Sequence, residues 1–355
     1  MVYCRLTSWH NFRNLTPRRL EWAAGLNLLI GNNGSGKTNA LEALHFLSGW
    51  GPFRSQRKSV LVNWNIEEKQ AFLRGFFSGE GDIDIVATVG EKNVIQCDGK
   101  RTTYGTIRSN IPTLAFLPGD LAIVDGAPSV RRQFLDRLCA LLFPLYVRKM
   151  SDCRKTLRHR AILLKERKDP SLTSKVLAPL VSWIWSTRAA AVDLLNIGIK
   201  EFYALLPAEI ELTFQRGGAF DLQDPLEDYW RSVKKWRDKE RITTVPQVGP
   251  QRDDMIITSK GQPVTMTMSR GQRRRTAASL MLAAGWAVER KMRRKPILIL
   301  DEIAAELDDY GRQLLIETLV QSSWQVFAAT AESSMGHWPG AIWNVHQGDI
   351  ERKNS

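Results

Sequence analysis

Short apolar runs and helical patterns alternate along the first part of the chain. Residues 2–9 and 19–30 run apolar or alternate with polar positions, which predicts strands. The helical spacing of Leu41, Leu44 and Leu47 predicts a helix soon after the second of these stretches. Further apolar stretches predict strands at 71–77, 83–89 and 93–97, with Asp98-Gly99 as a hairpin turn. This pattern predicts an α/β fold with an antiparallel β subdomain beside a parallel sheet.

Helical periodicity takes over in the middle of the chain. It extends through residues 144–206, and the break at Asp169-Pro170 predicts an antiparallel pair of helices. Ser129 is predicted to cap a helix that begins at residue 130. The remaining patterns predict helices at 225–241 and 270–290 and strands at 112–117, 209–214, 255–258, 296–300 and 325–329. In the helix at 225–241, aromatic residues at helical spacing are more typical of core than of a base-stacking platform.

A glycine-rich segment joins the predicted strand at 25–30 to the helix that follows it. It reads Gly31-Asn32-Asn33-Gly34-Ser35-Gly36-Lys37-Thr38 and matches the P-loop pattern G-x-x-x-x-G-K-[ST]. Its backbone N–H groups and the helix N-terminus suit phosphate oxygens, Lys37 reaches the β- and γ-phosphates, and Thr38 ligates Mg²⁺. The predicted ligand is a nucleoside triphosphate, and the alternative is a glycine-rich turn that binds nothing. Beside it, the predicted turn Asn11-Phe12-Arg13-Asn14 either contacts the nucleotide or is an ordinary solvated turn.

The predicted strand at 296–300 runs into Asp301-Glu302, the expected partner of a P-loop. In that pairing Asp301 holds Mg²⁺, and Glu302 polarises a water against the γ-phosphate, so Glu302 and Lys37 are the candidate catalytic residues. The alternative is a strand that happens to end in acids. Because Asp301 lies 264 positions after Lys37 (301 minus 37), the intervening chain is predicted to be inserted into one ATPase core. We therefore predict core parts at 1–142 and 246–355 and a helical lobe at 143–245.

The chain is strongly basic, with a net charge of +13 and a pI near 9.7. A chain this basic is a candidate for a polyanionic partner, either nucleic acid or an anionic membrane surface. Charge alone does not distinguish this from a basic surface that binds nothing. Residues 148–168 hold nine Lys or Arg and only two acids. This run is either a solvated face or a nucleic-acid contact, for which the candidates are Arg154, Lys155 and Arg158.

Several classes of protein are disfavoured by what the sequence lacks. No apolar run is long enough to span a bilayer, and the first residues show no signal-peptide core, so we expect no membrane association and a cytoplasmic location. The four cysteines are far apart and the five histidines are scattered, which argues against a zinc site and a disulfide scaffold. The expected cofactors are therefore ATP and Mg²⁺.

The segment Ser269-Arg270-Gly271-Gln272 begins the predicted helix at 270–290. Ser269 is placed to cap that helix, and the exposed N–H groups of a helix start form an anion site, although many helices begin with serine. With the P-loop and the acidic strand, the segment resembles the signature motif of ABC-type ATPases. In that class the signature of one subunit closes on the γ-phosphate held by the P-loop of the other. The same resemblance places Asp308 in the D-loop.

Nearly the whole chain resembles the RecF family of SMC/Rad50-like ATPases. The resemblance depends on these motifs: Asn11 to Asn14, Gly31 to Asn39 with Leu41-Glu42-Ala43, Phe53-Arg54-Ser55, Leu117 to Leu121, Pro128 to Asp136, Gly249 to Asp254, Ser269 to Gln272, and Asp301 to Asp308. It implies an ABC-type P-loop ATPase head without a long coiled coil, with Arg13, Asn14, Asn39 and Arg54 among the nucleotide-binding residues. It also implies weak, DNA-stimulated ATP hydrolysis, ATP-dependent homodimerisation on double-stranded DNA, and the partners RecR and RecO at gapped DNA.

The sequence departs from these patterns at three places. Gln251 stands where the family usually has histidine, Pro118-Gly119-Asp120 replaces the ABC Q-loop glutamine, and Thr330 follows the last predicted core strand where ABC proteins have the switch histidine. The last departure predicts slow hydrolysis. The absence of the Q-loop glutamine and of the switch histidine also disfavours the alternative function, an ATPase subunit of a membrane transporter. A phosphotransferase such as a kinase would need an acceptor site near the P-loop, and nothing in the sequence there suggests one. A nuclease relative would need an extra acidic metal-binding domain, for which we expect no residues after the last predicted strand.

Overall fold

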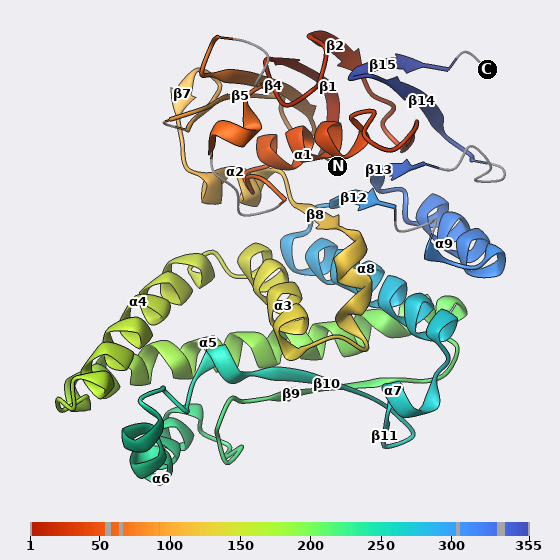
Figure 1. Ribbon diagram of the computed structural model, residues 1–355. Coiled ribbons are helices and arrows are strands. Elements are labelled where there is room, and N and C mark those ends of the chain that lie inside the picture. Colours follow the sequence, from red (N-terminus) through yellow and green to blue (C-terminus); the bar gives the residue numbers. More distant parts are fainter. Residues whose placement is uncertain are drawn as a thin grey trace. The chain divides into compact units, whose positions relative to one another are not determined.

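The computed structural model describes residues 2–53, 58–63, 67–91, 93–302, 306–331 and 338–353 (Figure 1). The chain divides into two compact units. The first comprises Met1–Leu121 and Val288–Ser355, and the second comprises Ala122–Ala287. The second unit is thus broader than the predicted helical lobe at 143–245, and the first unit is assembled from two distant segments of sequence.

A mixed sheet of six strands forms the centre of the first unit, in the order β15-β14-β3-β13-β12-β8. All neighbours are parallel except the terminal hairpin of β14 and β15. The strands are β3 (Leu26–Ile30), β8 (Thr113–Phe116), β12 (Ile297–Asp301), β13 (Gln325–Thr330), β14 (Ala341–His346) and β15 (Asp349–Arg352). Every residue of β8, β12 and β13 is buried, as the continuous apolar runs of a parallel sheet require.

A second, antiparallel sheet in this unit has the order β2-β1-β4-β5-β6-β7. Its strands are β1 (Tyr3–His10), β2 (Arg18–Glu21), β4 (Ala71–Ser78), β5 (Ile83–Val89), β6 (Val94–Cys97) and β7 (Lys100–Arg101). Helix α1 (Lys37–Leu47) contacts β4 and β5 of this sheet as well as β12 and β13 of the other. Its buried Leu41 and Phe46 therefore join the two sheets in one hydrophobic core. The short helices η1 (Lys58–Leu61) and α2 (Tyr104–Asn110), and α9 (Asp309–Ser322), complete the unit.

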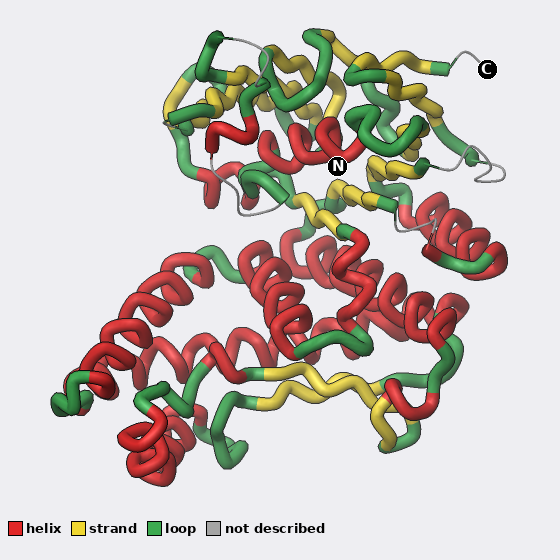
Figure 2. Tube along the Cα trace, in the orientation of Figure 1, coloured by secondary structure: helices red, strands yellow, loops and turns green. Residues whose placement is uncertain are grey.

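The second unit is mostly helical, with one small sheet (Figure 2). Its elements are α3 (Pro128–Leu142), α4 (Tyr146–Lys165), α5 (Ser171–Gly198), η3 (Ile199–Leu205), β9 (Glu211–Gln215), α6 (Pro225–Thr243), η4 (Pro250–Arg252), β10 (Asp254–Ser259), β11 (Gln262–Pro263) and α7 (Val264–Thr267). Helix α5 contacts α3, α4, α6 and β9, so it is the central element of this unit. Two elements, η2 (Pro118–Ile123) and α8 (Arg270–Met292), continue from one unit into the other.

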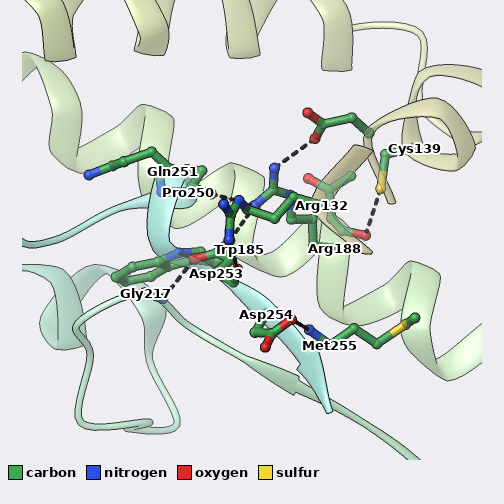
Figure 3. A network of polar contacts seen from close by, with 12 residues as sticks. Arg132, Cys139, Trp185, Arg188, Gly217, Pro250, Gln251, Asp253, Asp254 and Met255 are labelled. Carbon is green, nitrogen blue, oxygen red and sulfur yellow. Dashed lines mark hydrogen bonds and ion pairs between the residues drawn. The ribbon is translucent and has the colours of Figure 1, made fainter. Parts of the chain in front are cut away.

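A buried polar network ties the elements of the second unit together (Figure 3). The guanidinium of Arg188 on α5 donates to Asp253 (2.6 Å), to the Pro250 carbonyl (2.9 Å) and to Asp136 on α3 (2.6 Å). Asp253 also accepts hydrogen bonds from the Trp185 indole and the Gly217 N–H. A charged pair buried in this way stabilises a fold only when its remaining donors and acceptors are satisfied, as they are here.

Most predicted elements are confirmed, with one clear error at the start of α3. Ser129 does not cap this helix, because Pro128 is already its first residue and Ala127 is the cap residue, without a side-chain hydrogen bond. Proline is favoured at this position since its fixed φ suits the first turn and its missing N–H has no partner there anyway. The antiparallel pair at 144–206 is confirmed as α4 and α5, which pack together.

Among the described helices, none combines the length and the apolar character that crossing a membrane requires.

Candidate nucleotide-binding site

The P-loop connects β3 to α1, as its sequence predicts. Gly34 and Gly36 have φ values of 81° and 118°, a region that residues with a Cβ rarely adopt. Gly31 is required for a different reason, because a Cβ at this position would lie 2.2 Å from the Val345 carbonyl oxygen. The glycines therefore let the loop turn tightly against β14 and direct the N-terminus of α1 at whatever the loop encloses.

Lys37, the first residue of α1, has a side chain that is 5% exposed. Its ammonium group donates to the carbonyls of Gly31 (2.7 Å) and Asn32 (3.1 Å). The same nitrogen lies 3.8 Å from a carboxylate oxygen of Glu302. The loop thus holds a buried cation between its own backbone and an acid from the end of β12.

Thr38 and Asp301 are in direct contact although they are 263 positions apart in sequence. The Thr38 hydroxyl lies 3.1 Å from each carboxylate oxygen of Asp301. Asp301 is the last residue of β12 and is buried, and β13 separates β12 from β3 in the sheet. A hydroxyl and a carboxylate are hard oxygen ligands, so this pair fits Mg²⁺.

Glu302 adopts a left-handed backbone conformation with φ of 56°, uncommon for a residue other than glycine, asparagine or aspartate. Two hydrogen bonds to the end of β13 hold it: its N–H donates to the Ala329 carbonyl (2.9 Å), and its carboxylate accepts from the Ala331 N–H (3.2 Å). This arrangement fixes the carboxylate beside Lys37. Strained backbone of this kind is often found at functional sites.

Two further loops hold the P-loop in place. The Asn14 amide donates to the Gly34 carbonyl (3.1 Å) and accepts from the Asn39 amide (2.7 Å). On another side, the Gly348 N–H donates to the Ser35 carbonyl (2.7 Å). Asn14 and Asn39 therefore act on the loop itself, and the turn between β14 and β15 is a support that the sequence did not reveal.

The donors of this loop fit the phosphates of a nucleotide. The Ser35 hydroxyl is buried and has no hydrogen-bond partner among the described residues, which is unusual because buried polar atoms are nearly always paired. It belongs to the same loop as Lys37 and lies close to the helix N-terminus, and all three favour an anion. Asn33 completes the predicted loop and is exposed.

Arg13 is engaged by a carboxylate of the protein itself. Its guanidinium contacts Glu42 on α1 at 2.7 Å, and Glu42 is buried. The other oxygen of Glu42 accepts from the Phe53 N–H (3.0 Å), so Glu42 joins the turn at Arg13 to the segment that leads to Arg54. Arg54 itself lies outside the described residues. An acid on the buried side of an otherwise apolar helix is the signal that could have identified Glu42.

The segment at 269–272 forms a capping box at the start of α8. The Gln272 N–H donates to the Ser269 hydroxyl (3.3 Å), and the Ser269 N–H donates to the Gln272 side-chain oxygen (2.8 Å). The predicted cap is therefore confirmed, with Gln272 as an additional partner. Arg270 and Gly271 are exposed, and a Cβ added to Gly271 would meet nothing within 4 Å.

Asp308 also serves as a helix cap in this structure. Its carboxylate accepts from the Gly311 N–H (2.8 Å) at the start of α9, while its neighbour Leu307 is buried. Residues 303–305, which complete the predicted motif, lie outside the described residues. The D-loop role of Asp308 stays a prediction.

The predicted DNA contacts on α4 differ in their surroundings. Arg154 is exposed but contacts Asp136 (2.7 Å), and Lys155 lies 3.9 Å from Asp152. Arg158 is exposed. Arg160, from the same basic run, is buried and pairs with Glu240 of α6 (2.5 Å), so the run includes an internal ion pair as well as a solvated face.

Comparisons with known proteins agree with this geometry. Residues 5–348 match the model of the RecF/RecN/SMC N-terminal domain. The chain is 30% identical to the DNA replication and repair protein RecF of Bacillus subtilis, over 93% of both chains. It is 31% identical to that of Yersinia pseudotuberculosis, over 96% of both.

Solved structures give the same result. A structure of the recombination mediator protein RecF with ATP, described as part of the RecFOR pathway, superposes with a TM-score of 0.87. It is 26% identical in sequence, and the match covers 99% of this chain and 98% of that one. An SMC head bound to the winged-helix domain of ScpA has a TM-score of 0.60 at 17% identity, over 99% of this chain and 97% of that one, which shows a common fold.

Proposed function

Because this chain belongs to the RecF family, within the group that shares the RecF/RecN/SMC N-terminal domain, we propose that it is an ATP-dependent DNA-binding protein of recombinational gap repair and replication restart. ATP would drive two copies together on double-stranded DNA, and slow hydrolysis would release them. The match to proteins named for DNA replication and repair supports the first part and does not favour the alternative of a transporter subunit.

The observation that carries the proposal is the meeting of the two motifs within the first unit. Thr38 contacts Asp301, and Lys37 lies beside Glu302, although each pair spans most of the sequence. In the proposed site the N–H groups of residues 33–38 and Lys37 bind the phosphates, while Thr38 and Asp301 hold Mg²⁺. Bound MgATP would supply the phosphoryl group whose loss resets the protein. Glu302 would accept a proton from the attacking water.

A second copy would complete this site through its signature segment, Ser269 to Gln272, and through Asp308. Gly271 supports this proposal. Glycine destabilises a helix relative to alanine, yet nothing in the described chain crowds the position that its Cβ would take. Close approach by another molecule is a physical reason to keep glycine there.

Slow hydrolysis is supported by the residue at the end of β13. Thr330 is buried there, at the position where the ABC class has its switch histidine. Since no histidine follows this strand directly in sequence, the position of the switch histidine in the ABC class holds no imidazole that could shuttle a proton near neutral pH. This favours a protein that stays bound to DNA until slow ATP hydrolysis releases it over an ATPase with rapid turnover.

The DNA partner is supported by the net charge of +13 and by the exposed cations of α4, namely Arg154, Lys155 and Arg158. The preference for gapped DNA and the partners RecR and RecO come from the family resemblance alone. The stimulation of ATP hydrolysis by DNA is also proposed from the family resemblance.

Salt-dependent binding to duplex DNA, with and without ATP, tests the function directly. The native protein should bind much more tightly with ATP, and the logarithm of its affinity should fall linearly with the logarithm of salt concentration. Lys37→Ala should bind weakly in both conditions, because it loses the phosphate contact but keeps every DNA-binding residue. Lys69→Ala, at an exposed lysine outside the loop segment 31–38, is the matched control. Weak binding of the native protein that ATP does not change would refute the proposal.

A further inference from the structure

Three cations on α6 stand in a row on one face of the helix. Arg231, Lys235 and Lys239 are four residues apart, so each lies about 6 Å along the axis from the next. All three are exposed. We call these residues, together with the rings of Phe220 and Trp236, the α6 cation ladder.

The aromatic rings of the ladder lie between its charges. The Lys235 ammonium is 4.3 Å from the centre of the Phe220 ring and 5.3 Å from that of Trp236. Lys239 lies 4.8 Å from Trp236, and the Arg231 guanidinium lies 5.9 Å from Phe220. The Trp236 indole donates to the Gly218 carbonyl (2.7 Å), which fixes that ring. The rings attract the cationic heads and hold them in order along the helix.

In the part of the chain that the structure describes, none of the ladder's three cations lies within 4.0 Å of an acidic oxygen. Of the acids of α6, Asp228 and Glu240 are buried and pair with Arg216 (2.9 Å) and Arg160 (2.5 Å). Glu227, four residues before Arg231, and Asp238 are exposed. Like charges four residues apart destabilise a helix. Among the described residues, α6 therefore carries a row of three positive charges that forms no ion pair.

We propose that the α6 cation ladder binds a single strand of DNA. A row of evenly spaced cations matches the repeating phosphates of one strand, and Phe220, which is 43% exposed, is an aromatic side chain on which a base can stack. An acidic protein segment would satisfy the charges but would leave this aromatic surface without a matching partner. The inference rests on the proposed function, since it gives the protein a contact for the second kind of strand that a gap presents.

Fluorescence anisotropy with labelled oligothymidylate, measured on the full chain over a series of salt concentrations, tests the ladder. Lys235→Gln and Lys239→Gln should each reduce the slope of log affinity against log salt by about 0.7, the value for one phosphate contact with a single strand. Phe220→Leu keeps the charges and should weaken binding about ten-fold, in the range found when a stacking ring is removed. Lys175→Gln, at an exposed lysine of α5, is the matched control and should change neither quantity.

The outcomes separate this inference from the proposed function. Ladder variants that lose oligothymidylate binding but keep ATP-dependent duplex binding support the inference. Variants that bind oligothymidylate as tightly as the native protein overturn it, as do variants that weaken single-strand and duplex binding in parallel. Polyglutamate that competes with oligothymidylate at equal charge concentration also overturns it, because the ladder would then recognise any polyanion. Lys37→Ala should leave oligothymidylate binding unchanged, so a failure of ATP gating affects the proposed function alone. Lys235→Arg keeps the positive charge and should have the native slope of log affinity against log salt. That result would show that the lost charge, and not a folding defect, reduces the slope in Lys235→Gln.

Discussion

Arg188→Met should destabilise the second unit severely, because it removes the cation at the centre of the buried network (Figure 3). Methionine is of similar length and apolar, so the substitution deletes the charge and its hydrogen bonds while it fills much of the space. Four groups lose their donor: the carboxylates of Asp253 and Asp136, the Pro250 carbonyl and the Tyr146 hydroxyl.

The expected magnitude follows from what remains around Asp253. This carboxylate is fully buried and would keep only the Trp185 indole and the Gly217 N–H as donors. Removing one partner of a buried ion pair costs about 3–5 kcal/mol, since the other charge stays desolvated and unpaired. Such a loss is a large part of the roughly 5–15 kcal/mol by which a domain is stable.

Urea unfolding followed by tryptophan fluorescence measures this loss, and a double variant tests its cause. In Arg188→Met with Asp253→Asn both charges are gone, so the double variant should be clearly more stable than Arg188→Met alone. Two results would refute the reasoning: a single variant that loses less than about 1 kcal/mol, or a double variant that loses the sum of the two single losses.

The pH dependence of the same variant gives an independent check. Burial raises the pKa of Asp253 above its ordinary value, and Arg188 opposes that increase. Without Arg188 the folded-state pKa should be raised further. A carboxyl group with a raised folded-state pKa favours folding while it is protonated, and this contribution is lost as the pH increases through that pKa. The deficit of Arg188→Met relative to the native protein should therefore be larger at neutral pH than in mild acid, and an equal deficit in both would contradict the explanation.

Three further predictions concern the candidate site and one thiol. Glu302→Gln should keep the contacts of the loop but stop hydrolysis, so it should accumulate as an ATP-bound dimer in light scattering; a variant that stays monomeric with ATP would argue against a shared site. Gln272→Glu should keep the capping box with Ser269 and the native melting temperature but lose ATP-dependent dimerisation, because it brings a negative charge to the proposed phosphate contact. Gln272→Ala should instead lose about 1 kcal/mol of stability with the cap, and normal dimerisation of Gln272→Glu would exclude the signature role. Finally, burial and the neighbouring Asp98 raise the pKa of Cys97 to about 11, so its alkylation by iodoacetamide should be slow near pH 8 and should accelerate steadily as the pH is increased further; rapid alkylation at neutral pH would contradict this.

The part of the site that lies within one local motif was predictable from sequence. The conformations of Gly34 and Gly36 and the burial of Lys37 follow from the spacing of the P-loop, and Asp301 follows from an apolar strand that ends in acid. The physical reason is that these features depend on neighbours within a few residues. A continuous apolar run predicts a buried strand whatever sequence follows it.

The supports of the site were not predictable, because they depend on distant pairings. Gly348 reaches Ser35 because β14 pairs with β3, and Glu42 contacts Arg13 because the turn after β1 lies against α1. The second unit of the structure is broader than the predicted lobe at 143–245 for the same reason. Helix α3 belongs to it through contacts such as that of Arg131 with Asp254, which no local pattern encodes.

Strand β3, which carries the P-loop, lies between β13 and β14, and both of these strands come from the last part of the chain. During synthesis the ribosome therefore releases the P-loop long before either flanking strand exists. The sheet around β3 can close only when residues 325–346 have emerged. A nascent or truncated chain that stops earlier would contain the complete motif, yet its nucleotide loop would have neither neighbour to hold it. The order of the strands thus means that the sheet on both sides of the P-loop is completed only after residues 325–346 have been synthesised, and a copy that stops before them would not enter the ATP-dependent cycle proposed above.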